Sequence, residues 1–332
     1  MTTPYFLTRS IKQKGAAMLM ALLTVALVAV LSSWAMWQLW RTTEVETTER
    51  SFQQSRWLLN GALDWARVVL REDKRASELD HLGEPWAVPL KESRLSAFLA
   101  SDSSGGVEDE QGLLNQVFLS GRISDLQSRI NVNNLLDGGR LSPTYTRAFI
   151  KLFSVLGLPM SELDLFLQNF LASHNKSSKE GNTPIMPQRL EQLTWLGLSP
   201  QTVAQLAPHV TVLPAFTPLN LNTASAEAIF ASIPLLEMST ARNWVRKRQA
   251  KHWTSLDAMR SELGVGGANI NEREHQLSTK YFEVIGQVRY NQLVLIERSV
   301  VLRDGADLKI LWRERRPPGA QPGCLLTIDP PC

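Results

Sequence analysis

The sequence predicts an α+β protein that begins with a long membrane-spanning helix. An uncharged apolar run near the N-terminus continues into an amphipathic helical pattern, and residues after position 114 and again after position 279 alternate between apolar and polar. About 145 residues with helical periodicity separate these two β regions. Late strands need partners that cover their edges, so we expect one antiparallel sheet, packed on the N-terminal helix and interrupted by a large α-helical insertion.

Composition indicates a folded chain with no strong overall charge. Of the 332 residues, 44% are apolar and 20% are charged, which is typical of globular proteins with room for two folded regions. Arg9, Lys12 and Lys14 precede Gly15 without any acid, which leaves 32 basic and 32 acidic residues in the rest of the chain. This balance predicts no general attraction to nucleic acid or to acidic ligands.

Residues 16–40 are predicted to span a membrane. This uncharged run would extend ~37 Å as a helix, enough to cross a hydrocarbon core, and it is longer than the apolar region of a secretory signal. The basic leader before it places the N-terminus in the cytoplasm by the positive-inside rule, and Trp34, Trp37 and Trp40 suit the opposite interface. The bulk of the chain is therefore expected outside the cytoplasm.

The helical pattern continues past the apolar run. Phe52, Leu59, Leu63, Ala66 and Leu70 are spaced for one face of a helix, with no proline between residues 16 and 75 and no other interruption except Gly61. The sequence therefore predicts one continuous helix of about fifty residues, whose first half lies in lipid and whose second half packs on a domain.

The leader carries a resemblance to a known class of proteins. The basic segment ending in KQKG, followed directly by a hydrophobic helix, resembles the class III signal of type IV pilins and type II secretion pseudopilins. The resemblance implies that a prepilin peptidase cleaves between Gly15 and Ala16 and methylates the new N-terminus at Ala16. Two positions depart from the usual pattern, because Ala16 replaces phenylalanine and Met20 stands at the fifth mature position in place of glutamate.

The missing glutamate and the chain length resemble the K class of minor pseudopilins. An unpaired carboxylate in lipid is costly, so a subunit with no neighbour above it is better without one. The resemblance implies a pilin-like domain with a helical insert and an inner-membrane subunit with a periplasmic body. It also implies a non-enzymatic role at the tip of the pseudopilus, initiating its assembly for export of folded proteins across the outer membrane. The implied partners are minor pseudopilins of the I, J and H classes, contacted through residues 49–70, and the secreted substrates. An ordinary anchored periplasmic protein is the plain alternative.

These observations predict the following organisation along the chain: leader peptide 1–15; transmembrane helix 16–40; first part of the pilin-like domain 41–132; α-helical insertion 133–278, made of a first module 133–213 and a second module 214–278; completion of the sheet 279–316; and a proline-rich tail 317–332.

The strands are predicted from period-two alternation. Residues 114–132 alternate and break at Ser120-Gly121, which favours a hairpin. Three later strands are expected within residues 280–290, 293–303 and 308–314, linked at Asn291 and at Asp304-Gly305.

The insertion contains a weak internal repeat. An Asn-x-Asn pattern occurs in INVNNLL at residues 130–136 and in LNLNTAS at residues 219–225, and a helical pattern follows each copy. Asparagine, serine and threonine favour helix N-termini, so Thr223 or Ser225 is a candidate cap, with Glu227 in the first turn.

The second module offers an alternative function. Residues 219–263 resemble a helix-hairpin-helix DNA-binding module, which would suit a membrane-anchored DNA-uptake protein, and five basic side chains lie nearby: Arg242, Arg246, Lys247, Arg248 and Lys251. The turn at residues 234–239, however, contains Glu237 and no glycine. A phosphate can come close to backbone N–H groups only where no side chain covers them, as in a glycine turn. DNA binding is therefore disfavoured, and the basic run is interpreted as a solvated helix face.

Metal and catalytic signatures are weak. Acidic residues at positions 102, 108, 109 and 110 lack the spacing of an EF-hand loop, and although the K-class resemblance implies calcium, the sequence identifies no ligand set. The histidines at positions 81, 174, 209, 252 and 275 are scattered, and no catalytic motif is present. Cys324 and Cys332 lie in the tail, either joined as a short disulfide loop or free.

Overall fold

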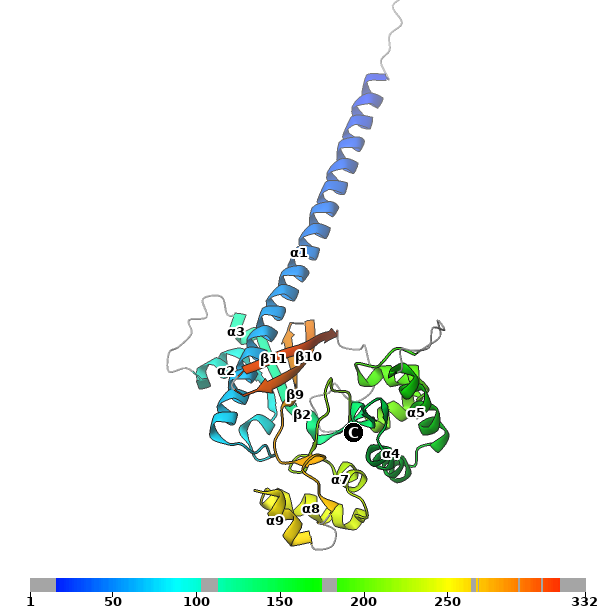
Figure 1. Ribbon diagram of the computed structural model, residues 1–332. Coiled ribbons are helices and arrows are strands. Elements are labelled where there is room, and N and C mark those ends of the chain that lie inside the picture. Colours follow the sequence, from blue (N-terminus) through cyan, green and yellow to red (C-terminus); the bar gives the residue numbers. More distant parts are fainter. Residues whose placement is uncertain are drawn as a thin grey trace, which may run out of the picture. The chain divides into compact units, whose positions relative to one another are not determined.

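The computed structural model describes residues 16–102, 113–174, 184–263, 267, 269–291, 293–305 and 307–316. Helix α1 (Ala16–Ala76) is the longest element, and the chain consists of two units divided after Gln54. The second unit contains one five-stranded sheet, with most of the helices inserted between two of its strands (Figure 1). The predicted leader, and the tail with Cys324 and Cys332, lie outside the described residues.

Helix α1 confirms the prediction of one continuous helix and is longer than expected, at 61 residues. Its buried side chains in the second unit are Ser55, Leu59, Leu63, Ala66 and Leu70, four of which the periodicity had identified. Phe52 is the exception, because it precedes this unit and remains 38% exposed. Helical spacing selects a face but does not show where along that face the packed surface begins.

The sheet is antiparallel throughout, in the order β1-β2-β9-β10-β11. The three predicted C-terminal strands are confirmed. The backbone takes a positive φ at the two predicted links, 54° at Asn291 and 63° at Gly305, as tight hairpins require. The strand bounds are β1 Leu90–Arg94, β2 Val117–Asp125, β9 Tyr281–Tyr290, β10 Leu293–Asp304 and β11 Asp307–Arg316.

The predicted hairpin at Ser120-Gly121 is wrong, because β2 runs through these residues without a turn. Gly121 lies opposite Gly286 of β9. A Cβ atom on Gly121 would lie 2.9 Å from the carbonyl oxygen of Ile285, and one on Gly286 would lie 3.3 Å from a methyl carbon of Leu59. Gly121 therefore permits close packing of the strands and does not mark a turn.

Helix α1 packs on the sheet through two apolar clusters. One joins Leu63, Ala66 and Leu70 to side chains of the sheet and of the short 3-10 helix η1 (Pro85–Ala87); its other buried members are Trp86, Phe282, Val284, Val301 and Leu308. The second joins Leu59 to Leu95, Val117, Leu119, Val288 and Leu295. Helix α2 (Leu95–Asp102) and the short helix α3 (Leu113–Gln116) connect β1 to β2.

The insertion is helical, as predicted, and most of its described helices share one hydrophobic core. Its helices are α4 Pro143–Leu156, α5 Met160–His174, α6 Pro200–Leu206, α7 Ala226–Ser232, α8 Met238–Ala250 and α9 Leu256–Leu263, with 3-10 helices η2 Leu126–Ser128, η3 Val132–Leu135 and η4 Leu190–Leu196. Short strand pairs close loops within it: β3 Ile130–Asn131 with β6 Val210–Thr211, β7 Leu219–Asn220 with β8 His275–Gln276, and β4 Leu136–Asp137 with β5 Arg140–Leu141.

The repeated asparagines fasten loops, and Asn131 also caps η3 by accepting from the N–H of Asn133. Asn131 donates to the carbonyl oxygen of Ala215 and accepts from the N–H of Leu213, while Asn222 makes the same two-way contact with the backbone of Trp253. Ser225 caps α7 by accepting from the N–H of Ala228, as expected for one of the two candidates. Thr223, the other candidate, donates its hydroxyl to Asp125.

A buried polar network joins the sheet to the insertion around Asp125, at the end of β2. The carboxylate accepts hydrogen bonds from the hydroxyls of Thr223 (2.5 Å) and Thr279 (2.6 Å), from the amide of Asn220 (3.0 Å) and from the N–H of Gln127 (2.6 Å). Asp125 has no ion-pair partner among the described residues. Burial raises its pKa to about 6, and its hydrogen bonds only partly oppose this shift.

We expect Gly121→Val to destabilise the second unit by about 2 kcal/mol, because the new side chain would collide with the backbone of β9. Urea unfolding of residues 42–332, followed by tryptophan fluorescence, measures this effect. Gly61→Ala is the matched control: a Cβ there meets no atom within 4 Å, and alanine favours the helix by about 1 kcal/mol. Equal stability of wild type and Gly121→Val would contradict the close-packing role.

The Asp125 carboxyl should make stability depend on pH. Its pKa is raised from 3.8 to about 6 in the folded state, so between these values the folded chain holds a proton that the unfolded chain has lost. Its contribution to the unfolding free energy is therefore largest at low pH and falls by about 3 kcal/mol as pH rises from 4 to 7. Asp125→Asn should remove this dependence, so the difference between variant and wild type should grow with pH. A constant difference in urea unfolding at pH 4.5 and pH 7 would refute the raised pKa.

Candidate functional site

The first part of α1 is built to lie in lipid. The helix contains a window with mean hydropathy 2.3, which by length and composition is sufficient to cross a membrane, and none of that window is buried within the protein. Ala16 is the first residue of the described helix, and Met20 is 70% exposed on it. The three predicted interfacial tryptophans, Trp34, Trp37 and Trp40, are all more than half exposed.

The second part of α1 has an exposed apolar face opposite its buried one. This outward face is defined by Trp57, Gly61, Trp65 and Val68, which follow the same helical spacing as the buried residues but are rotated away from them. Trp57 is 74% exposed and Val68 is 49% exposed. Trp65 is 36% exposed and its ring meets that of Phe98 edge-on at 5.3 Å.

Gly61 on this face has no structural role inside the described chain. Glycine in a helix interior costs about 1 kcal/mol relative to alanine, and a Cβ at this position would meet nothing within 4 Å. Trp57, one turn earlier, is a large apolar side chain left in water. A flat, apolar strip with a glycine between aromatic residues suits the close approach of a second helix.

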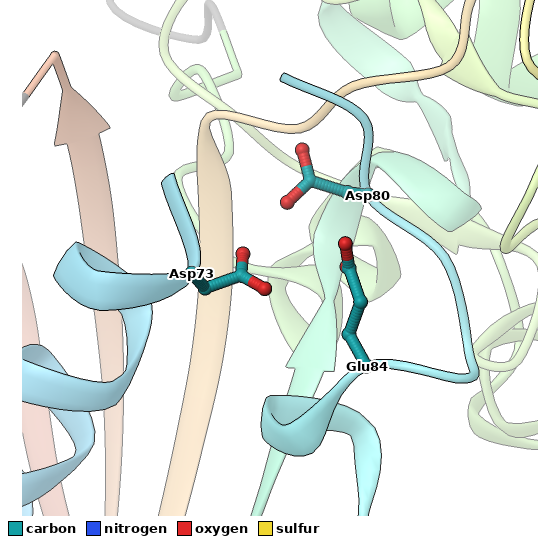
Figure 2. A group of neighbouring side chains, drawn as sticks. All are labelled: Asp73, Asp80 and Glu84. Carbon is teal, nitrogen blue, oxygen red and sulfur yellow. The ribbon is translucent and has the colours of Figure 1, made fainter. Parts of the chain in front are cut away.

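An acidic cluster lies at the end of α1 and in the segment after it. Asp73, Asp80 and Glu84 each bring a carboxylate oxygen within 4.8 Å of the others (Figure 2). Arg303 of β10 is bound to two of them: one guanidinium nitrogen lies 3.0 Å from Asp73, and the other lies 2.5 and 2.6 Å from the two oxygens of Asp80. Arg303 also donates to the carbonyl oxygens of Leu70 and Thr279.

The carboxylates in this cluster are already used by protein donors. Glu84 accepts from the N–H of His81 (2.9 Å) and from the indole of Trp86 (2.7 Å). Burial raises the pKa of Asp73 to about 6, assisted by the charges of Glu84 and Asp80 and opposed by Arg303. Burial likewise raises the pKa values of Asp80 and Glu84.

This cluster does not fit a calcium ion. Calcium takes six to eight oxygen ligands, whereas the guanidinium of Arg303 lies where a cation would have to bind. The arrangement is a buried ion pair that ties the end of α1 to the sheet. Sequence reasoning missed it, although an arginine within an apolar strand is a recognisable signal that a buried acid lies nearby. The acidic positions considered in the sequence, 102 and 108–110, have no described side chains.

The basic run on α8 is not a uniformly solvated face, which corrects part of the sequence interpretation. Arg248 is buried, donates to the carbonyl oxygen of Leu221 at 2.7 Å, and has its pKa lowered to about 10 by burial. Lys247 is paired with Glu262 at 2.5 Å. Arg242, Arg246 and Lys251 are exposed.

The turn before α8 is poorly suited to phosphate. Leu235 stands there with a φ of 59° and is 89% exposed, and Glu237 precedes the helix. An apolar side chain and a carboxylate thus replace the bare N–H groups that an anion needs. The geometry gives DNA binding no support.

Comparison with known proteins places these features in one family. Two family models, both described as Type II secretion system (T2SS), protein K, match residues 128–215 and 219–280. Type II secretion system protein K of Pseudomonas aeruginosa is 26% identical over 322 residues, covering 90% of this chain and 91% of that protein. The protein of the same name from Pectobacterium carotovorum subsp. carotovorum is 22% identical over 335 residues, covering 91% and 96%.

The fold is also that of a solved structure. The chain aligns with one from the crystal structure of the GspK-GspI-GspJ complex from the enterotoxigenic Escherichia coli Type 2 Secretion System, with a TM-score of 0.62 and 18% identity, covering 81% of this chain and 98% of that one. Together with the helical anchor, the sheet and its insertion, these matches show that the chain belongs to the type II secretion system protein K family, whose members are minor pseudopilins and not enzymes.

Proposed function

We propose that this protein forms the tip of a periplasmic pseudopilus, where it joins other minor pseudopilins and helps to initiate assembly for protein export. The observation that carries the proposal is the single helix Ala16–Ala76, which combines a lipid-soluble first part with an outward apolar face farther along. Such a helix can be held in the inner membrane and also pack laterally against similar helices.

Processing is part of the proposal. A prepilin peptidase would cleave after Gly15 and methylate Ala16, and the N-terminus would lie on the cytoplasmic side with the body in the periplasm. Met20 supports a position above all other subunits. An acidic residue there would need a partner amine within lipid, whereas the thioether of methionine needs none.

The helical insertion supports the same position. It comprises most of the helices of the second unit and has a large hydrophobic core of its own. A subunit with such an added body would obstruct the addition of another subunit above it, which suits a filament end and not a filament interior. Secreted substrates could meet this body first.

The partners are inferred from relatives and from the outward face. The solved structural relative is a complex of GspK with GspI and GspJ, and we infer I- and J-class partners here, followed by the H class. The contact surface would be the outward face defined by Trp57, Gly61, Trp65 and Val68, within the range 49–70 expected from the sequence. Partner helices anchored in the same membrane would run parallel to α1.

Leader processing is tested by intact mass. Co-expression with a prepilin peptidase should remove residues 1–15 and add one methyl group at Ala16, and Gly15→Leu should keep the leader attached because bulk at this position blocks the cut. Gly61→Ala is a control glycine substitution and should be processed normally. Retention of the leader in the wild-type chain beside an active peptidase would refute the assignment.

The outward face is tested by graded substitution of Gly61. Leucine there should leave the free chain folded, since its side chain enters open space, but should weaken association with partner minor pseudopilins at least tenfold, roughly 1.4 kcal/mol. Alanine adds one methyl group and should have a much smaller effect. Trp57→Ala should also weaken association by removing an apolar anchor.

Association is measured by titrating detergent-solubilised full chains with labelled I- and J-class partners. Circular dichroism of each free variant establishes that the helix content is unchanged. If both Gly61→Leu and Trp57→Ala bind as tightly as wild type, this face is not the partner surface.

A further inference from the structure

Two histidines that are far apart in the sequence form one stacked pair. The rings of His81 and His252 have their centroids 3.7 Å apart and their planes within 10° of parallel. His81 belongs to the segment between α1 and η1, and His252 belongs to the connection between α8 and α9. The pair therefore joins the end of the long helix to the helical insertion.

Both sides of the stack are held by their own backbone contacts. Beside His81, the N–H of Asp80 donates to the carbonyl oxygen of Leu277 at 2.9 Å, and the Asp80 side chain binds Arg303. Beside His252, the backbone of Trp253 is held by both polar atoms of Asn222. The rings thus meet between two fastened segments, so their stacking is a property of the fold.

Hydrogen bonding favours an uncharged ring at His81. The N–H of Gly83 donates to Nδ1 of His81 at 3.1 Å, so this nitrogen carries no proton and the neutral ring carries its proton on Nε2. Nε2 lies 3.8 Å from a carboxylate oxygen of Glu84. A second proton on His81 would place two donors against each other at Nδ1 and would break the contact with Gly83.

Two charged rings would also repel each other. Unit charges this close together repel each other even in water, and they repel several times more strongly near a protein surface, where the effective dielectric constant is lower. The charged groups that face the pair are Asp80 and Glu84 beside His81 and Lys251 beside His252, with Asp73 and Arg303 behind them. The two facing acids are engaged by Arg303 and by the donors of Glu84, so neither is free to pair fully with an imidazolium.

The direction of titration agrees with the geometry. Burial lowers the pKa of His81, although Asp80 opposes the shift. Burial also lowers the pKa of His252; the charge of His81 and Lys251 acts in the same sense, while Glu84 opposes it. The stacked rings therefore bind fewer protons than separated histidine rings, whose ordinary pKa is near 6.5.

We propose that the His81–His252 stack is an acid-released latch that holds the α8–α9 connection of the insertion against the segment following α1. The latch is closed while the rings are neutral and opens when both take up protons. Because stacked rings bind protons less readily, the contact is complete above pH 6.5 and is lost as pH falls below that value. This property belongs to the single chain and does not depend on its place in a filament.

The test is hydrogen–deuterium exchange of the full chain in detergent micelles at pH 7.5 and pH 5.5, with rates corrected for intrinsic exchange. In the wild type, protection of amides in residues 77–84 and 251–255 should fall at least tenfold at the lower pH. His252→Phe keeps an aromatic ring on the stack but cannot be charged, so in this variant the protection of residues 251–255 should be equal at both pH values. His252→Ala should lack this protection at both.

Neighbouring carboxyl groups require a distinction, because burial raises the pKa values of Asp73, Asp80 and Glu84, so the folded chain takes up protons at these groups too as the pH falls. If the protection of residues 251–255 in His252→Phe falls with pH as much as in the wild type, a group outside the histidine pair causes the change and the latch is refuted. Equal protection of the wild type at both pH values would refute it as well. Unchanged exchange in the amides of α4 shows that each variant remains folded.

Discussion

The packing of one face of α1 on the sheet is the contact on which the rest of the structure depends. Four apolar side chains at helical spacing meet the strands, and the helix approaches closely because Gly286 presents no side chain beneath Leu59. This contact fixes the rotation of the helix. With the inward face fixed, Trp57 and Gly61 must point outward, and Asp73 is carried to the place where it meets Arg303.

Polar groups then make the junction specific in a way that apolar packing alone cannot. Arg303 binds the end of α1, the segment after it and Thr279 just before β9, and the neighbouring Asp125 network binds the insertion. Buried charges are costly to leave unpaired, so only one arrangement of these segments satisfies them all. Apolar contacts supply most of the stabilisation. The polar contacts determine which orientation of the segments is stabilised.

Much of the architecture follows from local patterns. The long helix, its buried residues from Leu59 to Leu70, the three C-terminal strands with their two turns, and the cap at Ser225 were all predictable because each depends on spacing within a short segment. Gly121 was misinterpreted because a glycine that permits close packing has the same sequence signature as one that makes a turn. Its meaning depends on Ile285, far along the chain.

The contacts that could not be predicted are those between distant segments. Nothing near Arg303 in the sequence identifies Asp80 as its partner, and nothing near Arg248 shows that its charge is buried beneath Leu221. His81 and His252 looked isolated for the same reason. Local periodicity identifies elements, whereas charge partners emerge only once a sheet and an insertion have brought separate segments together.

The insertion leaves and re-enters the sheet at adjacent points, since Asp125 at the end of β2 lies opposite Phe282 of β9. The whole helical body therefore stands where an ordinary hairpin would have a few residues. Closing so long a loop costs about 3 kcal/mol more chain entropy than closing a four-residue turn. That cost largely disappears if the helical body becomes compact first, since the pairs β3–β6 and β7–β8 then shorten the loop that separates β2 from β9. This favours a folding order in which the interior of the sequence precedes its two flanks.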